Sequence, residues 1–73
     1  MENKRKIIKR LEEVYKETCL DVSALVYYRT DDGGEYVDVM APFLTRPWLT
    51  VNVTADSGVA MVYDVAKAIL KRV

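Results

Sequence analysis

The sequence predicts an α+β fold, a two-layer sandwich of a three-stranded antiparallel meander and two helices. Apolar residues recur at helical spacing near both ends of the 73-residue chain. Three segments between them are rich in β-branched and aromatic residues or alternate between polar and apolar ones. The connections are short, which favours neighbouring antiparallel strands. We therefore expect one domain, residues 1–73, with the order α-β-β-β-α and both helices on one face of the sheet.

The first predicted helix runs from a cap at Asn3 to about Cys19. Its apolar side chains fall on one stripe, as expected of a helix that packs on a sheet. Its first turns carry a basic cluster, although the helix dipole favours anions at that end. The cluster consists of Lys4, Arg5, Lys6, Lys9 and Arg10. It is either a solubilising helix end or a surface for an anionic partner.

Two strands joined by a hairpin follow this helix. Residues 22–30 (VSALVYYRT) are β-branched and aromatic, and residues 35–41 (EYVDVMA) alternate in polarity. Asp32 and Gly33 lie between them, and an Asp-Gly pair is a strong hairpin signal because a type I′ turn needs positive φ. We expect a two-residue turn centred on this pair.

The last strand and the second helix complete the order. Residues 48–54 (WLTVNVT) alternate in polarity after a loop, residues 42–47, that begins and ends with proline. The helix is capped by Asp56 or Ser57 and ends near Arg72. Since it is apolar on most sides, we expect it to be deeply buried or covered by a second subunit.

The predicted register exposes an aromatic sheet face. A two-residue turn pairs Thr30 with Glu35. If Met40 also lies opposite Trp48, side chains alternate between the two faces consistently in all three strands. The face turned away from the helices then carries residue types that are enriched in protein interfaces. With the nearby loop, the predicted partner-binding residues are Leu25, Tyr27, Arg29, Tyr36, Asp38, Met40, Phe43 and Trp48. Cross-strand pairing that stabilises the sheet without a partner is the alternative explanation.

The charge balance and the residue types argue against most enzymatic and metal-binding functions. Eleven basic and eleven acidic residues cancel, but the chain ends are basic and the middle is acidic. The acidic hairpin, with Asp31, Asp32 and Glu35, could face a basic surface. There is no histidine, the usual general base, and the single cysteine, Cys19, forms no internal disulfide or zinc site. No phosphate-binding glycine motif occurs. We expect no enzymatic activity, no cofactor and no metal.

One resemblance concerns element order. The α-β-β-β-α order and residues 66–70 (AKAIL) resemble the topology and last helix of the double-stranded-RNA-binding domain. That family grips phosphates with lysines at the start of its second helix. The same place here, residues 56–61 (DSGVAM), is acidic and apolar, so no site residue transfers. The resemblance implies nucleic-acid binding as an alternative function, with the basic first helix contacting phosphates.

The leading hypothesis from the sequence is a small non-enzymatic protein-binding module. It would act as a stoichiometric regulator or inhibitor, of the kind that mobile elements carry, on a protein partner whose identity is not encoded in any motif. A homodimer is an equally good use of the same sheet face. No signal-peptide pattern and no membrane-spanning apolar run occur, so we expect a cytoplasmic protein.

Overall fold

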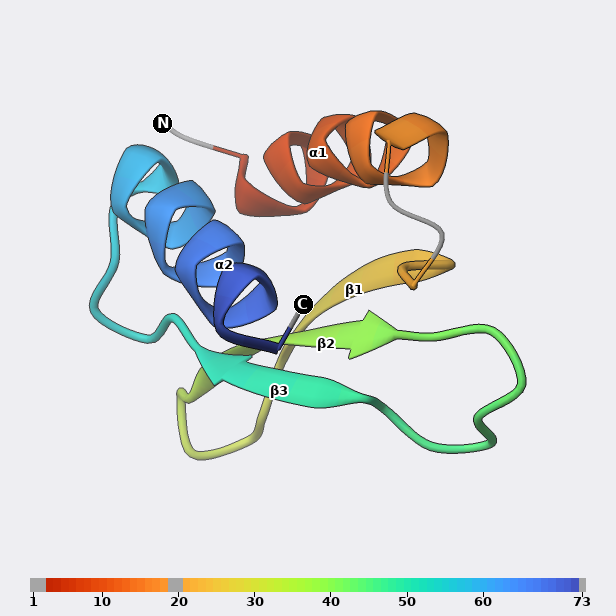
Figure 1. The fold of residues 1–73 in the computed structure, drawn as a ribbon. Coiled ribbons are helices and arrows are strands. Elements are labelled where there is room, and N and C mark those ends of the chain that lie inside the picture. The colour runs from red at the N-terminus through yellow and green to blue at the C-terminus, as the bar shows by residue number, and fades with distance from the viewer. Residues whose placement is uncertain (1–2, 19–20, 73) are drawn as a thin grey trace.

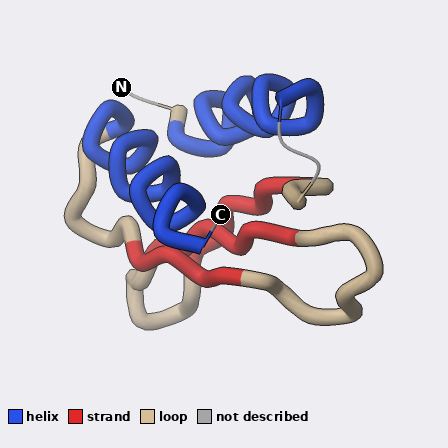
Figure 2. Tube along the Cα trace, viewed as in Figure 1, coloured by secondary structure: helices blue, strands red, loops and turns tan. Residues whose placement is uncertain are grey.

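The computed structural model describes residues 3–18 and 21–72 and confirms the α-β-β-β-α order (Figure 1). Helix α1 spans Lys4–Thr18, strands β1, β2 and β3 span Ala24–Arg29, Glu35–Met40 and Leu49–Asn52, and helix α2 spans Gly58–Arg72. The antiparallel sheet has the order β1-β2-β3. Both helices lie on one side of the sheet and leave its other face uncovered (Figure 2). Cys19 lies outside the described residues.

Side-chain caps begin both helices. The Asn3 Oδ1 accepts a hydrogen bond from the Lys6 backbone N–H at 3.1 Å, which confirms the predicted cap of α1. At α2, the Ser57 Oγ accepts from the Ala60 N–H at 3.1 Å. Ser57, rather than Asp56, is therefore the cap of α2, and the Asp56 carboxylate is free for other contacts.

The core lies between the helices and the sheet. Both helices contribute apolar side chains that are almost fully buried, with Ile8 on α1 and three residues at i, i+4 spacing on α2. The buried apolar residues are Ile8, Val22, Leu25, Val37, Val39, Val53, Met61, Val65 and Ile69. Each of these side chains would cost about 1.5–3 kcal/mol to leave in water, so together they decide which face of each element turns inward.

The hairpin turn between β1 and β2 is one residue longer than predicted. The Gly33 N–H donates to the Thr30 carbonyl at 3.0 Å, and the Thr30 N–H donates to the Gly34 carbonyl at 2.8 Å. Gly33 has a φ of 90°, as expected for the glycine that follows a type I turn in a G1 bulge. Because of the added residue, Arg29 rather than Thr30 lies opposite Glu35.

This shift of one residue turns β1 over, because side chains alternate between the two faces of a strand. Leu25 is only 4% exposed beneath the helices, whereas Val26 is 46% exposed. The prediction that Leu25, Tyr27 and Arg29 lie on the open face is therefore wrong. Val26 and Tyr28 take their places beside β2.

The register of β2 with β3 is confirmed, since Asp38 lies opposite Thr50. The prediction fails one residue before β3. The Trp48 N–H donates to the Val39 carbonyl at 2.8 Å, although Val39 is the partner of Leu49 in the ladder. Two residues thus oppose one, as in a β-bulge, and a bulge re-aims a side chain. Trp48 packs against the core instead of joining the open face.

Candidate functional site

The face of the sheet that the helices leave uncovered is the first candidate site. Its side chains follow from the observed register, and we call them the open-face cluster. The cluster consists of Ala24, Val26, Tyr28, Tyr36, Asp38, Met40, Thr50 and Asn52. The rings of Tyr28 and Tyr36 stack with their centroids 5.7 Å apart. Tyrosine and methionine are enriched at protein interfaces, so this composition suits a binding surface.

A hydrogen-bonded carboxylate lies at the centre of the open-face cluster. The Asp38 Oδ1 accepts from the Thr50 hydroxyl at 2.9 Å and from the Tyr28 hydroxyl at 3.3 Å. Partial desolvation and the Asp38 carboxylate both raise the pKa of Tyr28, so the phenol stays protonated and donates. The cluster therefore combines apolar side chains with one oriented charge.

The structure separates the residues that the sequence predicts to bind a partner. Three of them remain on the open face, namely Tyr36, Asp38 and Met40. Leu25 and Tyr27 pack with the core on the other side of β1. Arg29 shares their side of the strand by alternation and is exposed at the strand end. Val26 and Tyr28 were not predicted to bind a partner, and it is the three-residue turn that places them on the open face.

Glu35 of the predicted acidic hairpin is turned inward. Its Oε1 accepts hydrogen bonds from the Tyr27 hydroxyl and, at 3.1 Å, from the Lys4 Nζ. Lys4 also donates to the Val53 carbonyl at 3.2 Å. The bond from Tyr27, followed by that from Lys4, lowers the pKa of Glu35, while burial and Glu35 raise the pKa of Tyr27. These groups tie α1 to the sheet.

The tip of the hairpin keeps the other two predicted carboxylates, Asp31 and Asp32, in solvent. The Asp32 Oδ1 accepts from the Thr30 hydroxyl and, at 3.1 Å, from the Gly34 N–H. The bond from Thr30 is the main reason that the pKa of Asp32 is lowered, and the carboxylate stays charged. The hairpin thus presents two negative charges rather than three.

Of the five basic residues predicted on the first helix, four share one exposed side and Lys4 is turned toward the sheet. Lys4 is engaged with Glu35, and the Arg5 guanidinium lies 5.6 Å from the centre of the Tyr27 ring. With 3.6 residues per turn, Arg5, Lys6, Lys9 and Arg10 fall within an arc of about 140° around α1, and all four are exposed. Lys4 and Arg5 therefore have structural contacts, and Arg5 still shares one exposed basic side of α1 with the other three.

The loop after β2 forms an unusual turn. The Leu44 N–H donates to the Ala41 carbonyl at 3.4 Å across Pro42 and Phe43. Phe43 has a φ of 71°, and proline followed by a residue with positive φ is typical of a type II turn, in which glycine is preferred there. The Phe43 side chain is fully exposed. Pro42 signals the turn in the sequence, but nothing in the sequence signals this conformation.

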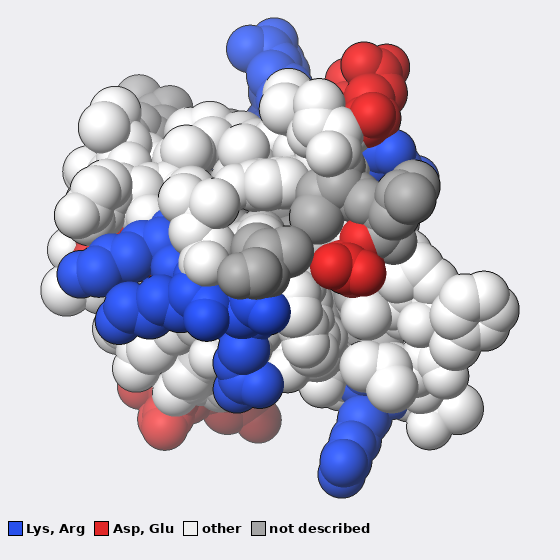
Figure 3. Space-filling model, viewed as in Figure 1, with Lys and Arg blue, Asp and Glu red and all other residues white. Residues whose placement is uncertain are grey.

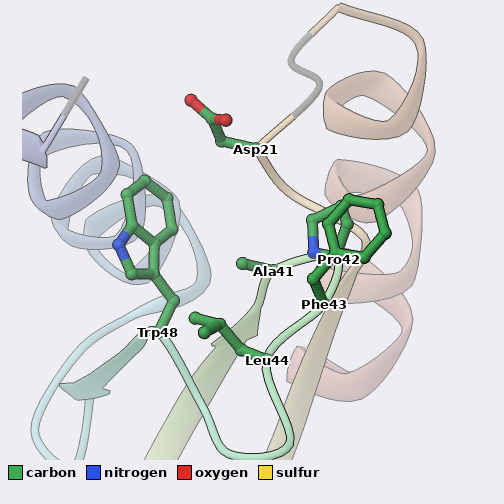
Figure 4. A pocket seen from close by; sticks show the side chains of 6 residues that line it. All are labelled: Asp21, Ala41, Pro42, Phe43, Leu44 and Trp48. Carbon is green, nitrogen blue, oxygen red and sulfur yellow. The ribbon is translucent and has the colours of Figure 1, made fainter.

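This turn forms one side of a shallow pocket, which we call the loop pocket. Its volume is about 300 Å³, and it is lined by Asp21, Ala41, Pro42, Phe43, Leu44 and Trp48. The rings of Trp48 and Phe43 stand on opposite sides of it, and the Asp21 carboxylate lies at its rim (Figure 4). Phe43 and Trp48, both predicted to bind a partner, are thus brought together away from the open-face cluster.

The outer side of α2 is a second exposed apolar surface. Val59, Tyr63 and Leu70 are 79%, 63% and 70% exposed and follow one another at helical spacing. The Lys67 Nζ lies 5.8 Å from the centre of the Tyr63 ring. Lys and Arg side chains gather over α2 in the space-filling view (Figure 3). The sequence predicts that α2 is either deeply buried or covered by a second subunit. Deep burial is observed on only one side of the helix.

Two carboxylates meet near the start of α2. The neighbouring Asp64 carboxyl group, followed by burial, raises the pKa of Asp56. The Asp56 Oδ2 is buried without a hydrogen-bond partner among the described residues. Within residues 3–18 and 21–72, no three His, Cys, Asp or Glu side chains are placed to hold a metal ion. We interpret the pair as a structural contact that depends on pH.

Comparison with protein-family models, curated proteins and solved structures gives no match to this chain. Neither helix in the described part of the chain has the length and apolar character needed to cross a membrane. Functional inference therefore depends on the surfaces themselves.

Proposed function

We propose that this chain is a small non-enzymatic protein-binding module and that its open-face cluster occupies a surface on a partner protein. The observation that carries the proposal is the one-sided sheet. Both helices cover the same face, and Val26, Tyr28, Tyr36 and Met40 remain on the other face around the hydrogen-bonded Asp38. A contiguous apolar surface on a small domain is characteristic of an interaction site.

The physical character of this face favours a protein over a small molecule as the ligand. A sheet face is broad, whereas small molecules bind in concave sites that enclose most of their surface. The stacked rings of Tyr28 and Tyr36 beside Asp38, with polar side chains such as Thr50 and Asn52 along β3, combine residue types that occur in the cores and rims of interfaces. Asp38, held by Thr50 and Tyr28, supplies an oriented acceptor that could determine register with the partner.

A non-enzymatic module acts by covering a surface of its partner protein. We therefore propose a stoichiometric regulator or inhibitor that works in the cytoplasm. Asp31 and Asp32 at the hairpin tip add negative charge at one end of the sheet. Such charge speeds association with a basic surface more than it strengthens the final complex. A second copy of the chain is the competing occupant of the open face, and the experiment below distinguishes it.

Site-specific photocrosslinking tests the proposal. The photoreactive amino acid p-benzoylphenylalanine is placed at Tyr36 on the open face and, as a matched control, at Tyr63 on the outer side of α2. We expect the variant with the photoreactive residue at position 36 to form a covalent adduct with one foreign protein. The variant with this residue at position 63 should not form that adduct. Val26→Arg should remove the adduct while circular dichroism stays unchanged, because Val26 is 46% exposed.

Three results would contradict the proposal. The first is the same set of adducts from both positions, and the second is no adduct from either. The third is an adduct only with a second copy, which would make the face a homodimer interface. Binding to double-stranded RNA that weakens steeply with salt would instead favour the nucleic-acid alternative. We expect no such binding, because the chain has no net charge and residues 56–61, at the start of α2, lack the lysines with which the double-stranded-RNA-binding domain grips phosphates.

A further inference from the structure

The Phe43 side chain does not offset the cost of the turn conformation that its backbone adopts. Its backbone adopts a φ of 71°, which is unfavourable for a residue with a side chain, and its ring is fully exposed to water. An exposed ring makes no packing contact that could offset this cost. Backbone strain of this kind is concentrated at binding sites, where it holds a side chain in a required place.

The opposite wall of the loop pocket is rigid. Trp48 packs against the core, and its backbone N–H is hydrogen-bonded to the Val39 carbonyl. Between the two rings, Ala41 and Leu44 provide apolar surface, and Asp21 brings a carboxylate to the rim (Figure 4). The pocket thus has two aromatic walls, an apolar floor and one negative charge.

We propose that the loop pocket binds an arginine side chain presented by a partner protein. A guanidinium group stacks on aromatic faces and pairs with a carboxylate through two parallel hydrogen bonds. The methylene stem of arginine can lie along the apolar floor between Ala41 and Leu44. The volume of about 300 Å³ is at the lower limit for ligand pockets and suits one long side chain rather than a larger ligand.

Arginine fits these walls better than lysine does. The lysine ammonium is a compact, strongly hydrated charge, and it loses more hydration when it enters an apolar pocket. The guanidinium is planar and weakly hydrated, so it can lie flat against the Trp48 indole, and the Asp21 carboxylate lies at the rim of the same pocket. This assignment goes beyond the proposed function, because it concerns a separate pocket and remains valid even if the open-face cluster binds nothing.

Tryptophan fluorescence provides a direct test, because Trp48 is the only tryptophan in the chain. The full chain is titrated with N-acetyl-arginine amide, N-acetyl-lysine amide and N-acetyl-citrulline amide, of which citrulline is the neutral isostere of arginine. We expect saturable quenching by the arginine compound with a dissociation constant on the order of a few millimolar. The citrulline and lysine compounds should bind at least about fivefold more weakly.

Two variants test the walls, and a third is the matched control. Asp21→Asn should weaken arginine binding about fivefold, and Phe43→Gly should remove it. Glu13→Gln removes a similarly exposed carboxylate on α1, outside both proposed sites, and should leave binding unchanged. Circular dichroism shows whether each variant is folded, and ligand shifts in nuclear magnetic resonance spectra replace fluorescence as a second readout.

Several results would overturn the assignment. Equal affinity for citrulline would make the pocket a neutral apolar groove, and equal affinity for lysine would make it a general cation site. Unchanged binding in a folded Phe43→Gly variant would show that the aromatic wall has no role. Absence of quenching by the arginine compound up to about 50 mM, an order of magnitude above the expected dissociation constant, would also reject the proposal.

Discussion

The two neighbouring residues Leu25 and Val26 provide the sharpest test of the sheet register. Leu25 is 4% exposed, and Val26 is 46% exposed. Truncating a buried leucine to alanine costs about 2–5 kcal/mol, whereas truncating a half-exposed valine should cost less than about 1 kcal/mol. A 73-residue domain has a total free energy of unfolding of about 4–11 kcal/mol. Leu25→Ala should therefore remove a large part of the stability, and Val26→Ala should not.

Urea unfolding followed by circular dichroism measures this difference. With a denaturant dependence of about 1 kcal/mol per molar urea, Leu25→Ala should lower the midpoint by about 2–5 M. The midpoint of Val26→Ala should fall by less than about 1 M. If Val26→Ala costs as much as Leu25→Ala, or more, the hairpin has the two-residue turn after all. The open-face cluster would then contain Leu25 and Tyr27, and the proposed binding surface would have to be redrawn.

Three further predictions concern backbone strain and pH. Phe43→Gly should raise the free energy of unfolding by about 0.5–1 kcal/mol and the melting temperature by about 2–8 °C, because glycine tolerates positive φ; a lower melting temperature would argue against strain. Gly33→Val should cost about 1–2 kcal/mol through its φ of 90° alone, since an added Cβ meets no atom within 4 Å, and an unchanged melting temperature would exclude this turn. The pKa of Asp56 is raised above its ordinary value of 3.8, so the stability that its protonated form contributes is present below that value and is lost as the pH rises through the raised pKa. Asp56→Asn, whose amide can donate to Asp64, should therefore be more stable than the original chain at pH 7 and lose this advantage near pH 3; a difference in urea midpoint that does not change with pH would contradict this.

The prediction of the site was wrong for β1, because one added turn residue reverses which side of that strand faces the helices. The Asp31-Asp32-Gly33-Gly34 segment suits both a two-residue turn and a type I turn with a G1 bulge, and both need glycine at positive φ. The longer turn places Leu25 in the core, where its backbone N–H also donates to the Glu12 Oε1 at 3.0 Å. That contact joins β1 to α1, and a local pattern carries no information about it.

The amino-acid sequence by itself determined the elements of this protein, their order, the Asn3 cap and the pairing of β2 with β3. These features depend on periodicity, capping chemistry and turn propensity, which act over a few residues. Only the tertiary structure decided which side of β1 faces the helices, where Trp48 points and how Phe43 is held. Such choices depend on small differences in packing free energy between alternatives that are locally equivalent, and those differences arise only when distant segments meet.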